Sequence, residues 1–201
     1  MIAPMSERWN HNLHYHPLVL DAVPAGAQTA LDVGCGEGTL ARRLSDRVPR
    51  VVGIDLDPLS VELARQEGGE GIEYVLGDVL TESLGQFDVV TSVATLHHMD
   101  ARVGLRRFAE LVRPGGRLVV VGLARSGTLD VPRDFAAAVA DRANAIVNRR
   151  RVTWEHPSPN VWPPPETFTA MRGIVKEVLP GARYRRHLYL RWSLVWDRPA
   201  A

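Results

Sequence analysis

The residues best suited to chemistry in this sequence lie in one short glycine-rich stretch, Leu31 to Gly38. The stretch follows an apolar run and reads Leu-Asp-Val-Gly-Cys-Gly-Glu-Gly, with glycines at alternate positions. Glycine lets the backbone take unusual torsion angles and lets a ligand approach the chain closely. The pattern therefore predicts a strand that ends in a turn, a helix that follows it, and a ligand that lies against the turn.

Two carboxylates stand at the ends of later predicted strands. Asp55 closes the second strand, and its carboxylate can accept two hydrogen bonds from a ribose diol. The alternative role for Asp55 is a helix cap, but Asp57 suits that role better because it directly precedes Pro58. Asp78 follows the third strand, where it serves either as a turn residue or as an acceptor for an adenine amino group.

Histidine is the usual proton-transfer residue near neutral pH, and the chain has seven. His97 and His98 follow the fourth predicted strand and are candidates for a catalytic base. The alternative for both is a structural or ligand-shielding role. His11, His14 and His16 have no carboxylate or cysteine at ligand spacing, so we expect no metal site.

The elements that must position these residues alternate between strand and helix. Such alternation indicates βαβ units around a mostly parallel sheet with helices on both faces, an α/β, doubly wound fold. Ligands of these sheets bind outside the carboxyl ends of the strands. The expected strands cover residues 30–33, 50–54, 72–76, 87–93 and 118–121, and the expected helices cover residues 39–44, 59–66 and 103–111.

The remaining segments complete one expected domain over residues 1–201. We expect a long insert, residues 124–165, to form a substrate lid because it exceeds the length of a plain connector. Trp154, His156 and Trp162 in this insert either line an acceptor pocket or pack the lid down. The other expected elements are helices at 9–23, 135–147 and 166–178 and a closing hairpin with strands at 184–187 and 190–196.

Composition narrows the class of protein. The 201 residues are 45% hydrophobic and 23% charged with a net charge of +1, which gives no long-range attraction to nucleic acid or anionic lipid. Cys35 is the only cysteine, so no intrachain disulfide forms and a reducing compartment is expected. No apolar run approaches the roughly 20 residues of a membrane helix. We expect a cytoplasmic protein without nucleic-acid or membrane partners, and the sequence does not specify its oligomeric state.

Taken in order, these motifs resemble the class I S-adenosylmethionine-dependent methyltransferases of the small-molecule type. The motifs are the glycine stretch, Asp55, Gly77-Asp78-Val79, the run from Phe87 to His98, and the run from Leu111 to Leu118. The resemblance is close over residues 30–122 and covers the rest in outline. It implies a seven-stranded sheet whose last strand is antiparallel, S-adenosyl-L-methionine as cofactor, and a small molecule as methyl acceptor.

The resemblance also implies roles for individual residues. The N-terminal segment, residues 1–24, would cover the cofactor, with Tyr15 at its methionine end and His14 a candidate for contact with the acceptor. Asp32 would contact the cofactor amino group indirectly. Gly34, Cys35 and Gly36 would touch the methionine part, Asp55 the ribose, Leu56, Asp78 and Val79 the adenine, and Ser92, Val93 and His97 the underside of the cofactor.

Three other functions are weighed against this one. A nicotinamide-dependent oxidoreductase would share the sheet and Asp55, but Thr39 stands where its G-x-G-x-x-G fingerprint has the third glycine. A nucleic-acid methyltransferase would place an acidic or amide residue, two prolines and an aromatic after the fourth strand, where this chain has Ala94 to His97. A non-catalytic cofactor-binding module is the third. Aromatic and apolar residues in the expected lid favour an aromatic or lipophilic acceptor.

Overall fold

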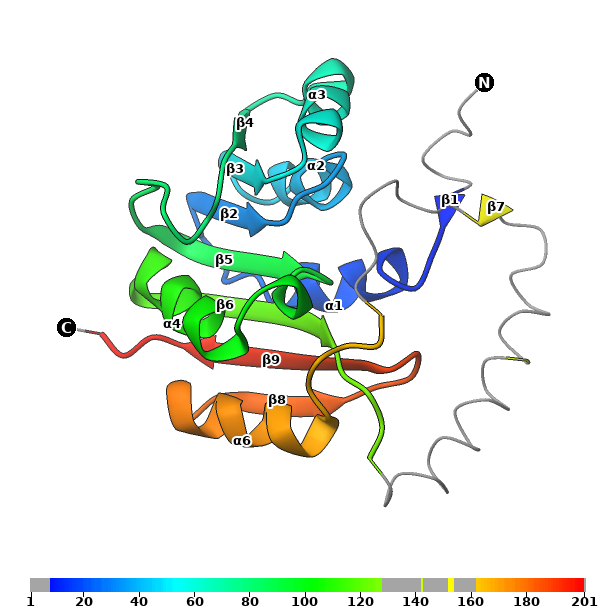
Figure 1. Cartoon of the computed structure of the whole chain (residues 1–201). Coiled ribbons are helices and arrows are strands. Elements are labelled where there is room, and N and C mark those ends of the chain that lie inside the picture. Colours follow the sequence, from blue (N-terminus) through cyan, green and yellow to red (C-terminus); the bar gives the residue numbers. More distant parts are fainter. Residues whose placement is uncertain (1–7, 128–141, 143–151, 154–161, 201) are drawn as a thin grey trace.

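The computed structural model describes residues 8–127, 142, 152–153 and 162–200. Its main feature is a sheet of seven strands in the order β4-β3-β2-β5-β6-β9-β8 (Figure 1). A separate parallel pair joins β1 (Arg8–Trp9) to β7 (Val152–Thr153). The strands of the main sheet are β2 (Thr29–Val33), β3 (Arg50–Asp55), β4 (Ile72–Leu76), β5 (Phe87–Val93), β6 (Val112–Leu123), β8 (Arg183–Arg186) and β9 (Arg191–Asp197).

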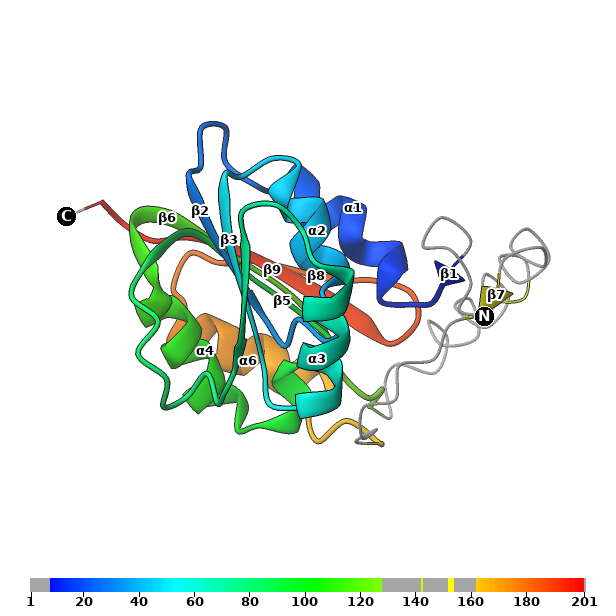
Figure 2. The ribbon, with the colours of Figure 1, turned by 90° about the horizontal axis from the view of Figure 1, so that it is seen from above.

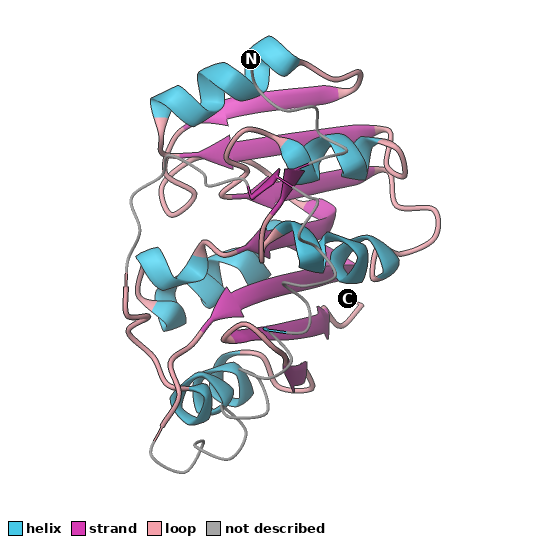
Figure 3. Ribbon diagram, turned by 90° about the vertical axis from the view of Figure 1, so that its right-hand side faces the viewer, coloured by secondary structure: helices cyan, strands magenta, loops and turns pink. Residues whose placement is uncertain are grey.

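The strand directions confirm the predicted fold class. Strands β4, β3, β2, β5 and β6 are parallel, whereas β9 runs antiparallel to both of its neighbours, β6 and β8. The chain winds outward from β2 through β3 and β4, and then returns to β5 on the other side of β2. The switch point therefore lies between β2 and β5, and ligands of such sheets bind at the carboxyl ends there. The arrowheads of β2, β5 and β6 point to the right in Figure 1, and Figure 3 turns this edge toward the viewer.

Helices cover both faces of the sheet (Figure 2). One core cluster packs the first three helices against the sheet and includes Val19, Leu44 and Val61. The other packs the last two helices and includes Phe108 and Trp192. The helices are α1 (His16–Asp21), α2 (Thr39–Ser45) and α3 (Pro58–Glu67) on the first face, and α4 (Ala101–Leu111) and α6 (Phe168–Val178) on the second, with short 3-10 turns η1 (Leu13–Tyr15) and η2 (Leu96–His98).

The predicted single helix over residues 9–23 is wrong, because the segment divides into β1, η1 and α1. The side chain of Asn10 accepts hydrogen bonds from the backbone N–H groups of Asn12 and Leu13, at 2.9 and 2.7 Å. Such local bonds compete with helical ones. Helix α1 starts afresh with Pro17 in its first turn, where the missing N–H costs nothing.

Helix α3 begins as the sequence predicts, with Asp57 as its N-cap. The Asp57 carboxylate accepts from the Ser60 N–H at 3.0 Å. This arrangement leaves Asp55, two residues earlier, available for another role. Strand β6, which was expected at residues 118–121, is longer than predicted. It starts at Val112 and includes the Pro-Gly-Gly sequence, where its pairing with β5 shifts register between Phe87 and Val89.

Most of the expected lid, residues 124–165, lies outside the described residues. These include Trp154, His156 and nearly all of the expected helix at 135–147. The insert leaves the sheet after Leu123, and Arg125 forms a parallel bridge with Thr167 just before α6.

In the part of the chain that the structure describes, no helix has the length and apolar character needed to cross a membrane.

Candidate functional site at the carboxyl edge of the sheet

The glycine turn after β2 is tied to the neighbouring strand. The N–H groups of Gly34 and Cys35 both donate to the Ile54 carbonyl at the end of β3, at 2.8 and 3.1 Å. All three glycines of the turn have positive φ angles. A Cβ atom on Gly34 would lie 1.9 Å from Oγ1 of Thr95, in the loop after β5. The turn therefore needs glycine both for its backbone angles and for the close approach of two strand ends.

Asp55, at the end of β3, faces this turn. Its Oδ2 accepts from the Gly36 N–H at 2.8 Å, and its Oδ1 accepts from the Asp57 N–H at 2.9 Å. Each carboxylate oxygen has a second lone pair, so two hydroxyl donors can still be accepted. The next side chain, Leu56, is 66% exposed and leaves an apolar surface beside the carboxylate.

Asp32 lies beneath the turn and is only 2% exposed. Its Oδ1 accepts from the Thr91 hydroxyl at 3.1 Å, but its Oδ2 has no partner among the described residues. Burial, together with the charge of Asp55, raises the pKa of Asp32 to about 7. An unpaired buried carboxylate oxygen is costly, and a cation above the turn would lower that cost.

The thiol of Cys35 is also buried within the turn. Burial and the charges of Asp32 and Asp55 raise its pKa. Because the thiolate is the reactive form of cysteine, Cys35 is a small packing residue here and is a poor nucleophile.

The end of β5 closes the floor of the site. Ser92 is fully buried and its hydroxyl has no partner among the described residues. Ala94 then takes a positive φ of 57°, which turns the chain sharply. The Thr95 hydroxyl lies 3.3 Å from the carbonyls of both Val33 and Val93, so it links the ends of β2 and β5.

His97 and His98 follow in η2 with their rings 4.1 Å apart. His97 is 9% exposed, and its Nδ1 has no partner in the described part of the chain. Burial, with smaller effects from His98 and Arg191, lowers the pKa of His97 to about 4. A general base works best with a pKa near the operating pH, so the environment of His97 favours hydrogen bonding over proton abstraction. Burial also lowers the pKa of His98, and Asp55 opposes this shift.

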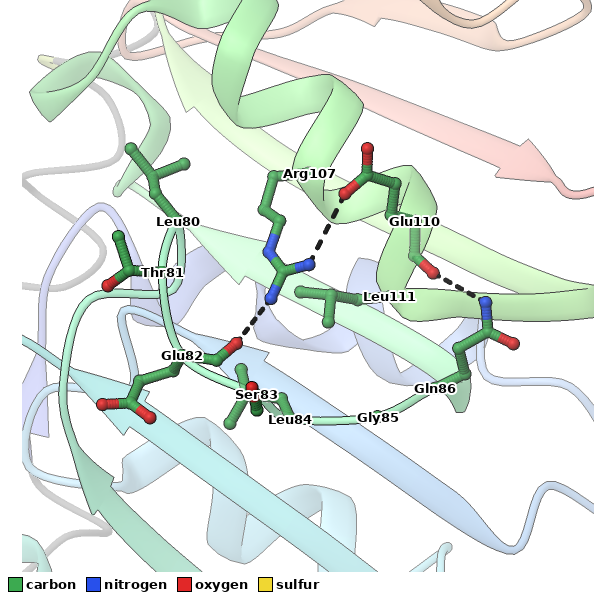
Figure 4. Close-up of a pocket in the computed structure, with 10 residues that line it drawn as sticks. All are labelled: Leu80, Thr81, Glu82, Ser83, Leu84, Gly85, Gln86, Arg107, Glu110 and Leu111. Carbon is green, nitrogen blue, oxygen red and sulfur yellow. Dashed lines mark hydrogen bonds and ion pairs between the residues drawn. The ribbon is translucent and has the colours of Figure 1, made fainter.

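The segment after β4 is held by an arginine that the sequence analysis missed. The Asp78 side chain accepts from the Leu80 N–H at 2.9 Å. Arg107 of α4 donates to the carbonyl of Val79 at 2.8 Å and to the carbonyl of Glu82 at 2.5 Å (Figure 4). The position of Arg107 on an amphipathic helix does not indicate this role, because the loop that it binds lies more than twenty residues away in the sequence.

A cavity of about 460 Å³ opens beside this loop, lined by residues 80–86 and by Arg107, Glu110 and Leu111 (Figure 4). None of the predicted site residues lines it, so it lies apart from the site. A smaller cavity of about 150 Å³ adjoins His97 and is lined mainly by apolar side chains, among them Leu96, Leu123 and Met171.

The N-terminal residues dock at the other side of the edge. The Tyr15 hydroxyl donates to the Leu188 carbonyl at 3.0 Å. The ring of His14 lies edge-on to those of Tyr15 and Tyr189, at 4.9 and 5.5 Å. Tyr15 and His14 thus pack on the turn between β8 and β9. In the expected lid, the side chain of the candidate acceptor contact Trp162 is 59% exposed.

The structure thus gathers most predicted site residues along one line of strand ends. Asp78 follows β4, Asp55 ends β3, the glycine turn follows β2, and Ser92 lies near the end of β5. The polar and apolar groups along this line fit an adenosyl group joined to an amino acid. They offer acceptors for two hydroxyls at Asp55, an exposed apolar side chain beside it, and an orphaned carboxylate oxygen under a glycine turn.

Comparisons with known proteins show the family and the fold. Residues 31–120 match the family model described as a methyltransferase domain. An uncharacterized methyltransferase of Mycobacterium bovis is 39% identical over 203 residues, covering 97% of this chain and 100% of that protein. A ubiquinone biosynthesis O-methyltransferase of Xanthomonas axonopodis pv. citri is 38% identical over 58% of this chain and 49% of that protein. The crystal structure of the N-methyltransferase NodS from Bradyrhizobium japonicum has a TM-score of 0.61 at 16% identity, covering 93% of this chain and 87% of that one.

Proposed function

The chain belongs to the class I S-adenosylmethionine-dependent methyltransferases, and on that basis we propose that it methylates a small-molecule acceptor bound over the carboxyl ends of β5 and β6 and the start of β9. The observation that carries this proposal is the pair of carboxylates, Asp32 and Asp55, placed under and beside the glycine turn. The strand ends beyond β5 lie outside that cofactor-binding line and are therefore left for the acceptor.

When bound, S-adenosylmethionine would supply an activated methyl group for an in-line attack by the acceptor, and an acceptor with a protonated oxygen or nitrogen would also release that proton. The chain then contributes position and exclusion of water. Asp55 holds the ribose hydroxyls, with Leu56, Asp78 and Val79 around the adenine. Gly34, Cys35 and Gly36 hold the methionine part, Asp32 acts on its amino group indirectly, and Ser92, Val93 and His97 form the floor.

We propose an aromatic or lipophilic acceptor. The small apolar cavity beside His97 supports this class, and so does the relative that is an O-methyltransferase of ubiquinone biosynthesis. His97 is neutral at pH 7, so its unpartnered Nδ1 can accept a hydrogen bond from an acceptor hydroxyl and orient it. Trp154, His156, Trp162 and His14 are proposed as further acceptor contacts.

We also propose a single domain in which residues 1–24 cover the cofactor, with Tyr15 at its methionine end, and residues 124–165 form the substrate lid. The net charge of +1 supports the absence of a nucleic-acid or membrane partner, and the single cysteine supports a cytoplasmic location.

The test is a calorimetric titration of the purified protein with S-adenosylmethionine, S-adenosylhomocysteine and NADH, followed by mass spectrometry of reactions with a panel of phenols and quinols. We expect micromolar binding of the first two ligands, none of NADH, and a methylated product. Binding of NADH alone would favour the alternative function, a nicotinamide-dependent oxidoreductase. Tight cofactor binding without product from any acceptor would favour the non-catalytic module.

A further inference from the structure

The carboxyl edge holds a buried charge that the proposed function leaves unexplained. Arg191 begins β9 and is only 8% exposed. Its Nη1 donates to the Tyr189 carbonyl at 2.9 Å, and its Nη2 donates to the Asn12 side-chain oxygen at 2.8 Å. Its Nε–H has no acceptor among the described residues. Both acceptors are neutral, and no carboxylate in the described part of the chain forms an ion pair with Arg191.

Burying a guanidinium without an opposite charge costs several kcal/mol. Two other arginines of the sheet region are more exposed than Arg191, and each still has a carboxylate partner. Arg113 pairs with Asp88 at 2.7 Å, and Arg117 pairs with Asp197 at 2.5 Å. Burial lowers the pKa of Arg191 only to about 10, so the side chain keeps its charge at neutral pH. A buried cation without a counter-charge suggests that an anionic ligand completes the site.

Arg191 lies apart from the glycine turn and Asp55, although it is near Tyr15 and His97, which are proposed at the methionine end and underside of the cofactor. In the register of the sheet it lies opposite Leu123, near the end of β6. The strand order places β9 three strands from β2, which at the usual strand spacing is roughly 14 Å from the glycine turn. Leu123, the register partner of Arg191, lines the small cavity together with His97, and the charge of Arg191 contributes to the lowered pKa of His97.

The surroundings hold the guanidinium rigidly. Tyr189 and Leu190, just before it, have positive φ angles of 58° and 53°. Such angles persist in non-glycine residues only where neighbouring contacts enforce them. The Tyr15 hydroxyl bonds to the Leu188 carbonyl, and the ring of His11 stacks on that of Tyr189 at 4.4 Å. The donors of Arg191 are therefore preorganised.

We propose that Arg191 binds a carboxylate of the methyl acceptor, so that the acceptor is an aromatic or lipophilic acid. This inference rests on the proposed function. The Nε–H lacks an acceptor, and Nη2 carries a second hydrogen besides the one given to Asn12, so the pair can meet both oxygens of a carboxylate. The cofactor also carries a carboxylate on its methionine part, and the experiment must separate these two sources.

The first arm measures carboxylate preference. The protein saturated with S-adenosylhomocysteine is titrated with benzoate and benzamide, and with 4-hydroxybenzoate and 4-hydroxybenzamide, by ligand-observed NMR. We expect the acid to bind about tenfold more tightly than its neutral amide, and Arg191→Gln to abolish the difference. The control Arg102→Gln, which removes an exposed ion pair with Glu177, should keep it. The proposal is overturned if neither acid binds more tightly than its amide. It is also overturned if the preference for the acids survives Arg191→Gln.

The second arm identifies the source of the carboxylate. S-adenosylhomocysteine and 5′-methylthioadenosine, which lacks the amino-acid part, are titrated into the wild type and Arg191→Gln. We expect unchanged affinity for both. A tenfold loss for S-adenosylhomocysteine alone would assign Arg191 to the cofactor carboxylate and overturn the acceptor assignment. If the wild type binds neither nucleoside, the proposed function fails, whereas the benzoate comparison without cofactor still tests Arg191.

A folding control accompanies both arms, because Arg191→Gln removes two buried hydrogen bonds. Circular dichroism and thermal unfolding verify the fold. Arg191→Lys serves as a second variant, since it keeps the charge but loses the planar pair of donors. We expect the preference for acids to fall by about threefold and to persist. An undiminished preference in folded Arg191→Lys would contradict recognition by the paired donors.

Discussion

The two sides of the carboxyl edge are built in different ways. The side formed by β3, β2 and β5 joins the glycine turn to two successive residues, Ile54 and Asp55, of the adjacent strand. The side formed by β6 and β9 depends on partners at opposite ends of the chain, as in the bond from Arg191 to Asn12. A site made from successive strands leaves a motif in the sequence. A site made from distant segments leaves scattered residues.

The two sides also differ in charge. The first side buries a carboxylate, Asp32, whose pKa is raised to about 7. The second buries a cation, Arg191, and a neutral histidine, His97. A cationic ligand group favours the first environment and an anionic group favours the second. This polarity would suit a cofactor whose ammonium group lies on the first side and the proposed acidic acceptor on the second.

The largest expected effect comes from Gly34→Ala, which breaks the first side alone. The new Cβ would overlap Thr95, and the residue would keep a φ of +71°. We expect a loss of on the order of 3 kcal/mol in unfolding free energy and no measurable binding of S-adenosylhomocysteine. Chemical denaturation and calorimetry measure the two effects.

Gly26→Ala is the matched control for this change. Gly26 has a φ of +80°, but a Cβ there meets nothing within 4 Å. Gly26→Ala therefore introduces the strain of a positive φ without the overlap, and it should keep the affinity for S-adenosylhomocysteine. Equal losses in the two variants would mean that the approach of β2 to the loop after β5 has no special importance.

A smaller effect is expected from Asp55→Ala. It removes the proposed acceptor of the ribose hydroxyls, so the dissociation constant for S-adenosylhomocysteine should rise about tenfold to a hundredfold in calorimetry. Asp57→Ala is the control, because it removes the cap of α3 and lowers stability without touching the ligand. Unchanged affinity in Asp55→Ala would remove Asp55 from the site.

Asp32 and His97 should contribute to the free energy of unfolding with opposite pH dependences, each changing it by about 1–2 kcal/mol. The folded pKa of Asp32 is raised from 3.8 to about 7, so its stabilising effect is present below pH 4 and is lost as the pH rises through 7. The folded pKa of His97 is lowered from 6.5 to about 4, so its effect is present above pH 6.5 and is lost as the pH falls through 4.

Thermal unfolding between pH 4.5 and 8 tests this contrast in Asp32→Asn and His97→Gln. Relative to the wild type, the first variant should gain stability as the pH rises and the second as the pH falls. Each variant serves as the control for the other. Parallel pH profiles in the two variants would show that the two sides do not differ in buried charge.

The smallest effect is expected from Arg107→Met, which keeps the aliphatic packing but frees the loop at Val79 and Glu82. Arg107 is a positioning residue, so the dissociation constant for S-adenosylhomocysteine should rise roughly threefold. The discrimination between adenosine and inosine should narrow as well, which a loss of stability alone would not cause. Arg102→Met, at an exposed ion pair, should change neither quantity.

The sequence predicted that the glycine stretch and Asp55 come together at the ends of β2 and β3, and the structure places them there; their contacts with the cofactor stay a prediction. Glycines at alternate positions, Asp55 and Asp57 all act through neighbours that are close in the chain or on the adjacent strand, so their spacing reflects their geometry. The expected helix at 9–23 was wrong because Asn10 bonds to its own backbone, a local competition that apolar periodicity does not register. Arg107 was missed because its partners lie on a separate loop.

By itself, the sequence determined the α/β fold, because hydrophobic periodicity and glycine spacing record local backbone requirements. Its resemblance to known methyltransferases indicated the family and the antiparallel last strand. Only the tertiary structure showed that Arg191 is buried without an ion-pair partner, that His97 lies near it, and that Asn12 and Tyr15 hold the final turn in place. These facts depend on which chain segments meet. Burial and charge compensation are properties of that three-dimensional neighbourhood, and no residue carries them in its own identity.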